Sequence, residues 1–427
     1  MKITIKHMIA NLLIAMLLMN ACSDQEFLPP AIGEPIPFED KNLKRLDEIL
    51  GTDNNQLFAK VWKKSNLKPM FAEKKANYTL LLPSNAAMEK AGYNQSRIDA
   101  MDANSADSLI WYYTFAEEIT KQNLTDAIGN IKYLSLLKNT NWQILRPYSY
   151  QFGYLPYQYA HYMKVTDGKL FSNGIEIGKA DDSYPVANGY VWPIQEMIKV
   201  PTLDFYDVFE KDPRFSMCIE IKKRSDDIHD QNFRKLFKEI NRYETGKYRD
   251  NSRLYYNNWA KPITKNVLYD TMFLPTNDAF KAAGFQSVDD VIEWNKRAPA
   301  LKLKQYTSSS YEGGFPSDTI INYHIGWGRE NQLYNPLFGK TEGPTPTVFY
   351  ANDLKSDWIS SYLVNKGSNN FQLVMPFYFA TNDKGQVQVW LKESNAPKAT
   401  IVETIQTVQG PVHVVDRLFI PKDFKIK

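Results

Sequence analysis

Histidine and cysteine are the side chains of this sequence best suited to catalysis or metal binding, and their spacing supports neither. The chain contains five histidines and two cysteines. Four histidines lie beyond the first 21 residues: His161, His229, His324 and His413. None of them belongs to a metal-binding motif such as H-E-x-x-H. We therefore predict no metal site and no catalytic residue.

The surroundings of these side chains favour structural roles instead. His324 and His413 are flanked by apolar residues, which predicts two core histidines that form hydrogen bonds with buried polar groups. Cys218 lies in the apolar run FSMCIEI, which predicts a small buried residue rather than a nucleophile. One such thiol can form neither a disulfide framework nor a thiolate metal site.

Motifs of other enzyme classes are also missing from the sequence. It contains no G-x-S-x-G, no P-loop and no G-x-G-x-x-G. The acidic pairs Asp181-Asp182 and Asp289-Asp290 join neighbours in the chain, whose side chains point apart in a helix or a strand. They therefore do not suit paired-carboxylate hydrolysis. We predict that the protein is not an enzyme and needs no cofactor.

Aromatic residues are the unusual feature, at 14% of the chain with 26 tyrosines. The segment 148–162, YSYQFGYLPYQYAHY, has no helical period, and tyrosine offers a flat apolar face with a polar tip. A second cluster follows His324. The candidate binding residues are Tyr148, Tyr150, Tyr154, Tyr157, Tyr159, Trp327 and Trp358. The alternative is that these rings only pack the segments onto their own domain.

The first 21 residues are typical of an export signal. Lys2 and Lys6 precede a short apolar run, and a small residue, Ala21, stands before Cys22. The apolar run is shorter than the ~20 residues that span a bilayer. A cysteine at this place resembles the lipobox of bacterial lipoproteins, which implies lipidation (diacylation) of Cys22 and an outer-membrane anchor. The alternative is a plain cleaved leader.

A tether is expected between this anchor and the folded part. The acidic stretch after Cys22 resembles a surface-export signal of Gram-negative lipoproteins, which implies that the protein faces the cell exterior. The alternative is a merely polar tether. Residues 22–40 contain four prolines, which favour an extended spacer. The formal charge of +3 falls to about +1 without the two leader lysines, so no nucleic-acid partner is implied.

An internal repeat organises the remaining chain. The segments NYTLLLPSNAAMEKAG, from Asn77, and NVLYDTMFLPTNDAFKAAG, from Asn266, share an apolar run, a proline, a Ser/Thr-Asn pair and a closing glycine. This order predicts a buried strand, a stop at proline, a capped helix start and a glycine past the helix end. The segments that end at Pro201 and Pro421 also match, with Trp192 where His413 stands.

Local patterns predict further elements. Residues 41–66 have the apolar spacing of two amphipathic helices, broken between Gly51 and Asn55. Residues 105–119 have a helical apolar face. Residues 165–178 predict two strands joined at Asn173-Gly174, a strong hairpin signal.

MFLPTNDAF, then Tyr323-His324, then GPVHVVDRLFIP with His413 and Asp416, resembles the fasciclin (FAS1) domain. The first half resembles it more weakly, with Tyr112-Tyr113 in place of the tyrosine-histidine pair. The resemblance implies an α+β fold of two FAS1 domains in tandem, each a β-wedge flanked by helices and enlarged by insertions. The expected domains are 41–201 and 202–427.

The same resemblance implies adhesion or extracellular binding rather than catalysis. We expect a surface lipoprotein, an accessory subunit of an outer-membrane complex that takes up glycan or peptide nutrients. Its partners would be a TonB-dependent transporter with its lipoprotein lid, and a polysaccharide or peptide. The alternative is an adhesion module for host matrix or neighbouring cells.

Overall fold

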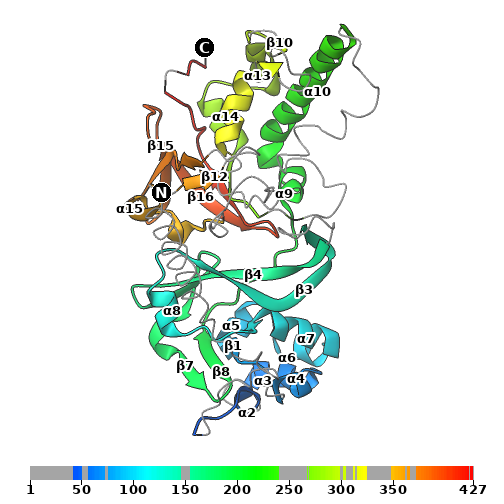
Figure 1. Cartoon of the computed structure of the whole chain (residues 1–427), viewed down its shortest axis with the longest axis vertical. Helices are drawn as coiled ribbons and strands as arrows, with labels where there is room; N and C mark the ends of the chain where they lie inside the picture. The colour runs from blue at the N-terminus through cyan, green and yellow to red at the C-terminus, as the bar shows by residue number, and fades with distance from the viewer. Residues whose placement is uncertain are drawn as a thin grey trace, which may run out of the picture.

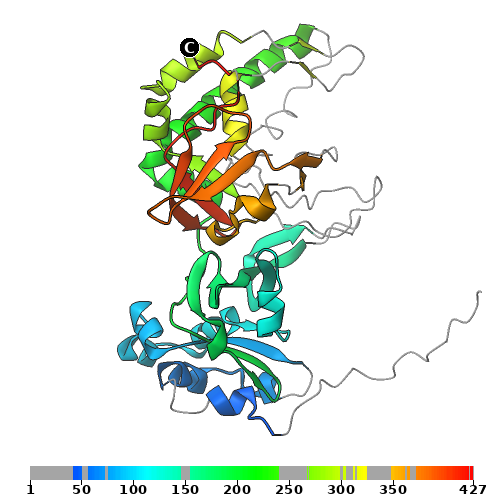
Figure 2. The same cartoon turned by 90° about the vertical axis from the view of Figure 1, so that its left-hand side faces the viewer.

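The chain forms two α+β units, and the fold class is the predicted one. The computed structural model describes residues 42–50, 56–72, 76–145, 154–239, 267, 269–298, 302–303, 311–312, 315–324, 348–360, 363–365, 372–422 and 424–426. The predicted signal, Cys22 and the tether lie outside these residues. The units lie one above the other along the long axis, with the blue-to-green half at one end and the C-terminal half at the other (Figures 1 and 2).

The first unit combines short helices with a large sheet. Its helices are α2 (Leu46–Leu50), α3 (Gln56–Lys64), α4 (Lys68–Ala72), α5 (Asn85–Lys90), α6 (Gln95–Asp99), α7 (Ala103–Tyr112) and α8 (Lys121–Thr125), with the 3₁₀ turn η2 (Ala180–Asp182). Its strands are β1 (Tyr78–Pro83), β2 (Thr114–Phe115), β3 (Ile131–Leu145), β4 (Tyr154–Thr166), β5 (Lys169–Ser172), β6 (Ile175–Lys179), β7 (Tyr184–Val186) and β8 (Gly189–Ile194).

These strands form one curled sheet in the order β6-β5-β4-β3-β2-β1-β8-β7. The curl brings β6 back to the end of β8, where the amide of Gln195 donates to the carbonyl of Ile177 at 2.7 Å. All six residues of β1 are buried, which explains why YTLLLP is a continuous run and does not alternate.

The second unit also combines helices with strands, which form a five-stranded sheet and two two-stranded sheets. Its helical elements are α9 (Phe205–Lys211), η3 (Pro213–Phe215), α10 (Ser216–Glu239), α12 (Asn277–Ala282), α13 (Val288–Asn295), α14 (Pro316–His324), η5 (Ala351–Asp353) and α15 (Ser356–Ile359). Its strands are β9 (Met272–Pro275), β10 (Lys302–Leu303), β11 (Tyr311–Glu312), β12 (Leu363–Asn365), β13 (Gln372–Val374), β14 (Phe377–Thr381), β15 (Val387–Leu391), β16 (Ala399–Gln406) and β17 (Pro411–Val415).

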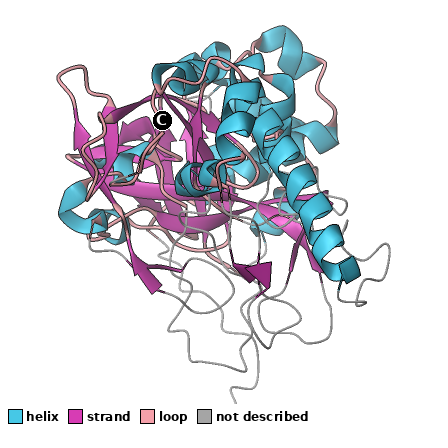
Figure 3. Cartoon of the chain, turned by 90° about the horizontal axis from the view of Figure 1, so that it is seen from above, coloured by secondary structure: helices cyan, strands magenta, loops and turns pink. Residues whose placement is uncertain are grey.

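Two cores lie on either side of strands β9 and β17. Met272 and Val412 pack with the helices, whereas Phe273 and Val415 pack with the strands β14–β16. The sheet order is β14-β15-β16-β17-β9. Seen from above, helices gather along one side of the strands (Figure 3). Because both faces of β9 and β17 are covered, their sequences are apolar except for His413.

The repeated segments perform the same tasks in both units. β1 pairs in parallel with β8, and β9 pairs in parallel with β17. Ser84 caps α5 by accepting from the amide of Ala87, and Thr276 caps α12 by accepting from Ala279. Gly92 and Gly284 then have φ of +83° and +101°, the left-handed conformation predicted for them.

The asparagine after each cap links its helix to an earlier one. The side-chain oxygen of Asn85 accepts from the amide of Leu57 at the start of α3, at 3.0 Å. That of Asn277 accepts from the amide of Met217 at the start of α10, at 2.9 Å. This shared contact satisfies a free amide at a helix start in each unit.

The closing strands also begin alike. Asn188 accepts through its side chain from the amide of Leu46, and Gln409 accepts from that of Phe205, each the first residue of a helix. The next residues, Gly189 and Gly410, have φ of +144° and +140°. The duplication predicted from sequence therefore extends to individual hydrogen bonds.

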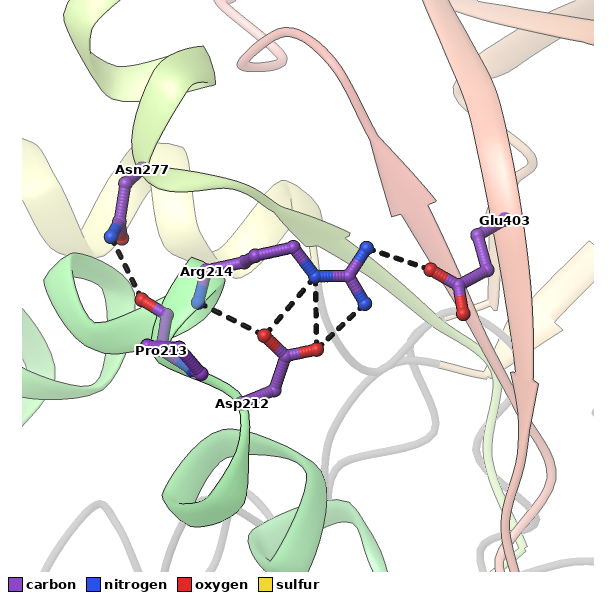
Figure 4. A network of polar contacts seen from close by, with 5 residues as sticks. All are labelled: Asp212, Pro213, Arg214, Asn277 and Glu403. Carbon is purple, nitrogen blue, oxygen red and sulfur yellow. Dashed lines mark hydrogen bonds and ion pairs between the residues drawn. The ribbon is translucent and has the colours of Figure 1, made fainter.

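Asn277 also belongs to a polar cluster at the second unit's surface (Figure 4). The guanidinium of Arg214 contacts the carboxylate of Asp212 at 2.6 Å and that of Glu403, on β16, at 2.8 Å. Asn277 donates to the carbonyl of Pro213 at 2.9 Å. These ion pairs are about half exposed, so each contributes only ~0–1 kcal/mol, and the cluster serves to fix η3 against the sheet.

Of the helices and strands predicted from local patterns, some are present and one is partly wrong. The helices of residues 41–66 and the hairpin at Asn173-Gly174 are present, with φ of +51° and +77° at the turn. The helix predicted for 105–119 is wrong beyond Tyr112, because Thr114 and Phe115 pair with β1 as β2. No helix in the described ranges is long and apolar enough to cross a membrane.

Candidate binding site

The hairpin β3–β4 separates the two units and contacts both (Figure 1). The ring of Tyr157 lies 6.1 Å from that of Tyr269 in the second unit, and Tyr162 lies 5.4 Å from Tyr350. All four rings are buried. Lys132 of β3 adds a cation–π contact, with its Nζ 3.7 Å from the centre of the Tyr269 ring. The first core therefore continues into the second unit.

A buried polar contact between Asp353 and Asn130 also joins the two units. Asp353 is 2% exposed, and its Oδ1 accepts from the amide of Asn130 at 2.8 Å. Its Oδ2 accepts from the Asn130 side chain at 2.5 Å and from the amide of Tyr350 at 3.3 Å. Burial raises the pKa of Asp353 to about 6, and these hydrogen bonds oppose that rise. The carboxylate therefore depends on Asn130 near neutral pH.

Replacing Asn130 with alanine should destabilise this junction by ~1–3 kcal/mol, because the buried carboxylate loses a donor. The loss should shrink at pH 5, where a protonated Asp353 has less need of it. Urea unfolding at pH 7.5 and pH 5 measures both values. Asn395→Ala, at an exposed position, is the control. Equal unfolding midpoints for the two variants at pH 7.5 would contradict the role of Asn130.

The structure places the sequence-predicted binding residues in different environments. Tyr157 and Tyr159 are buried, and their rings lie 5.0 Å apart at nearly right angles. Trp358 is partly buried, and a Cβ on Gly129 would lie 2.8 Å from its ring. Tyr154 lies in β4. The remaining candidates, Tyr148, Tyr150 and Trp327, lie outside the described residues. In this structure the described rings pack at or beside the junction.

The predicted motif histidines lie in the interior and form hydrogen bonds through both ring nitrogens. Nδ1 of His324 donates to the carbonyl of Phe273, and its Nε2 accepts from the amide of Phe419. Nε2 of His413 donates to the carbonyl of Phe349, and its Nδ1 accepts from the hydroxyl of Thr404. These contacts join α14, Phe349 and Phe419 to the strands β9, β16 and β17, and neither ring faces solvent.

The other motif residues also have structural contacts. Tyr323 packs against the core beside the sheet, and Asp416 accepts from the amide of Thr400 at 2.7 Å. Tyr113, at the place of His324 in the first half, donates to the carbonyl of Ile198 at 2.7 Å. Cys218 is fully buried, and burial raises the pKa of its thiol well above the usual range.

A pocket of about 730 Å³ opens where helices α6 and α7 face strand β3. Two irregularities in the pairing of β3 with β4, between Leu134 and Lys138 and between Asn139 and Gln143, put extra residues into β3. Such bulges redirect side chains and occur often beside binding sites. Here they present Lys138 and Asn139 to the pocket.

The lining suits the binding of a polar ligand that also has apolar faces. Seven of its fourteen residues carry hydroxyl or amide groups: Tyr93, Asn104, Ser105, Ser108, Asn139, Thr140 and Tyr159. The phenol of Tyr159 accepts from the side chain of Asn139 at 2.9 Å. Met101, Leu109 and Leu137 supply apolar surface. Pockets of this size and mixed composition are common sites for small ligands.

Sequence reasoning missed most of this pocket. Of the lining residues, only Tyr159 is a binding candidate from the sequence; Arg97, Asn104 and Lys138 belong to no motif. The strand irregularity has no sequence signal either. Within the described part of the chain, no group of three or more histidine, cysteine, aspartate or glutamate residues is arranged to hold a metal ion.

Comparison with known proteins places one domain in a family. Residues 53–199 match the family model of the fasciclin domain. A comparison with curated protein sequences finds no match. Among solved structures, the chain is similar to a FAS1 domain pair from the insect cell adhesion molecule fasciclin I, with 13% identity and a TM-score of 0.31, over 89% of this chain and 97% of that one. The family model thus identifies a fasciclin (FAS1) domain at residues 53–199 of this chain.

Proposed function

We propose that this protein is a non-enzymatic binding module, held by lipid at the outer membrane and facing the cell exterior. The single observation that carries the proposal is the pocket between α6, α7 and β3, which is lined with hydroxyl, amide and aromatic side chains. FAS1 domains are adhesion-type modules, which is consistent with binding rather than catalysis.

The sequence of the first 40 residues supports the location. The leader and Cys22 favour a lipid anchor, and the proline-rich tether would hold the first unit away from the membrane. We propose that the protein serves there as an accessory subunit of a complex that takes up glycan or peptide. The complex would contain a TonB-dependent transporter and its lipoprotein lid.

Adhesion to host matrix or neighbouring cells is the second candidate, and the fasciclin match favours it. Affinity purification of the lipidated chain from solubilised outer membrane separates the two functions. Recovery in equal amounts with a transporter supports uptake. Isolation as a single chain, together with attachment of cells or matrix to the purified protein, supports adhesion.

The pocket itself is tested by polysaccharide binding. The mature chain should be retarded in gels that contain its ligand polymer, and Asn104→Ala should weaken binding by about fivefold to tenfold, the value of one ~1 kcal/mol hydrogen bond. Asn395→Ala, in the other unit, should bind like the unmodified chain. Equal retardation of the Asn104 variant would exclude this pocket as the binding site.

A further inference from the structure

The pocket carries charge of one sign only. Of its fourteen lining residues, Arg97 and Lys138 are charged, and neither aspartate nor glutamate is among them. Arg97 comes from α6 and Lys138 from β3, so the two cations belong to different walls. Two like charges in one pocket raise the local concentration of an anion.

The guanidinium of Arg97 has N–H donors that can bind a ligand. Its guanidinium carbon lies 4.3 Å from the centre of the Tyr93 ring, and Nη1 donates to the carbonyl of Gly92 at 3.5 Å. A guanidinium has five N–H donors in a plane, and they match the two oxygens of a carboxylate. Stacking on Tyr93 fixes the plane of this group, which lowers the entropy lost on binding.

The acidic residues next to the pocket already have local partners. Asp99 accepts from the side chain of Gln95 at 2.6 Å. Asp102 caps α7 by accepting from the amide of Ser105 at 2.8 Å. Among the residues with described contacts, neither Arg97 nor Lys138 forms an ion pair with a carboxylate. A ligand would therefore not have to displace an internal partner.

We propose that this pocket binds a carboxylated sugar, such as a uronic acid unit of an acidic polysaccharide. This inference rests on the proposed function and names its ligand class. The carboxylate pairs with Arg97 and Lys138. The sugar hydroxyls pair with Asn104, Ser108 and Thr140, and the apolar face of the ring packs on Met101 and Leu137.

A sugar fits this lining better than an acidic peptide does. Half of the lining residues carry hydroxyl or amide groups, and five of these seven lie in α7 and β3, which matches a ring that carries several hydroxyls. A run of acidic side chains would need a cation for each carboxylate, and the pocket provides two.

The experiment uses polygalacturonate and its fully methyl-esterified form, which share a backbone and differ in charge. We expect the mature chain to bind the acid form, with weaker binding as salt increases. Arg97→Gln and Lys138→Gln should each weaken it about tenfold. The controls Arg417→Gln and Lys384→Gln remove the same charges from exposed positions of the second unit and should leave binding unchanged.

Each other outcome overturns a distinct statement. Equal binding of the esterified polymer, with unchanged binding by the Arg97 and Lys138 variants, would refute carboxylate recognition but keep the pocket as a glycan site. Binding of polyglutamate in place of both polymers would refute the sugar assignment. Absence of binding to acidic and neutral polysaccharides and to polyglutamate, by a chain with a normal melting temperature, would remove the proposed function itself.

Discussion

Replacing Gly189 with alanine should destabilise the first unit by ~3–5 kcal/mol, among the largest effects of any single substitution. Gly189 has φ of +144°, and a Cβ there would lie 1.7 Å from the carbonyl oxygen of Tyr78. The backbones of β8 and β1 would have to separate at the first residue of their parallel pairing. Urea unfolding followed by tryptophan fluorescence measures the loss.

Two other glycines test whether the close approach of the strands causes this loss of stability. Gly410→Ala should have a similar cost, because its Cβ would lie 2.3 Å from the carbonyl oxygen of Asp270. Gly385 also has a positive φ, +76°, but nothing lies within 4 Å of its Cβ position. Gly385→Ala should therefore cost only the ~1–2 kcal/mol of the left-handed conformation. If all three variants lost equal stability, the close approach of the strands would not be the cause.

Acid should unfold this protein well above the pH at which most carboxylates titrate. His161, His324 and His413 are fully buried, and burial lowers their pKa values to about 4, about 3 and about 4. In the unfolded chain each should titrate near ~6.5. Below that pH the unfolded chain binds protons that the folded chain does not, so stability falls with pH from about 6.5 to about 4.

The free energy of unfolding should change steeply with pH. Each histidine contributes up to ~1.4 kcal/mol per pH unit in this window, so the three together contribute up to ~4 kcal/mol per unit. Asp353 acts in the opposite direction, because its pKa is raised to about 6 and the folded state binds its proton more tightly than the unfolded state does. The net slope between pH 6 and pH 4.5 should still be that of about two histidines.

Replacing one buried histidine at a time with glutamine measures how much each contributes to the pH dependence of stability. His413→Gln should lower stability at pH 7.5 by ~1–3 kcal/mol, because one of its hydrogen bonds to Phe349 or Thr404 is lost. It should also reduce the pH slope by about one proton. Unfolding followed at several pH values gives both quantities. A variant with unchanged stability and an unchanged slope would show that His413 is not held neutral in the folded chain.

Local signals predicted most of the fold. Ser84, Thr276, Gly92 and Gly284 stand where a helix start and end require their residue types, and each has that role. These features depend on neighbours in the chain, so a single sequence records them. The helix expected past Tyr112 failed because the pairing of Thr114 with β1 competes with a helical pattern, and that partner is distant in sequence.

The junction and the pocket could not be predicted in this way. Asn130 and Asp353 are separated by 223 positions, and neither belongs to a motif. The tyrosines of 148–162 are unusual in composition, but composition does not say whether a ring meets solvent or Tyr269. Arg97 and Lys138 line the same pocket, and Lys138 lies between the two pairing irregularities of β3, for which the sequence has no signal.

The parallel pairing of the opening and closing strands has a mechanical consequence. The chain enters β1 at Tyr78 and leaves β8 at Ile194, which lie at opposite ends of the ladder. Tension along the polypeptide therefore loads the hydrogen bonds of this pair in shear, all at once, and does not unzip them one by one. The pair β9 and β17 repeats the arrangement. A protein anchored at one end and pulled through a bound ligand would therefore resist force at both parallel strand pairs.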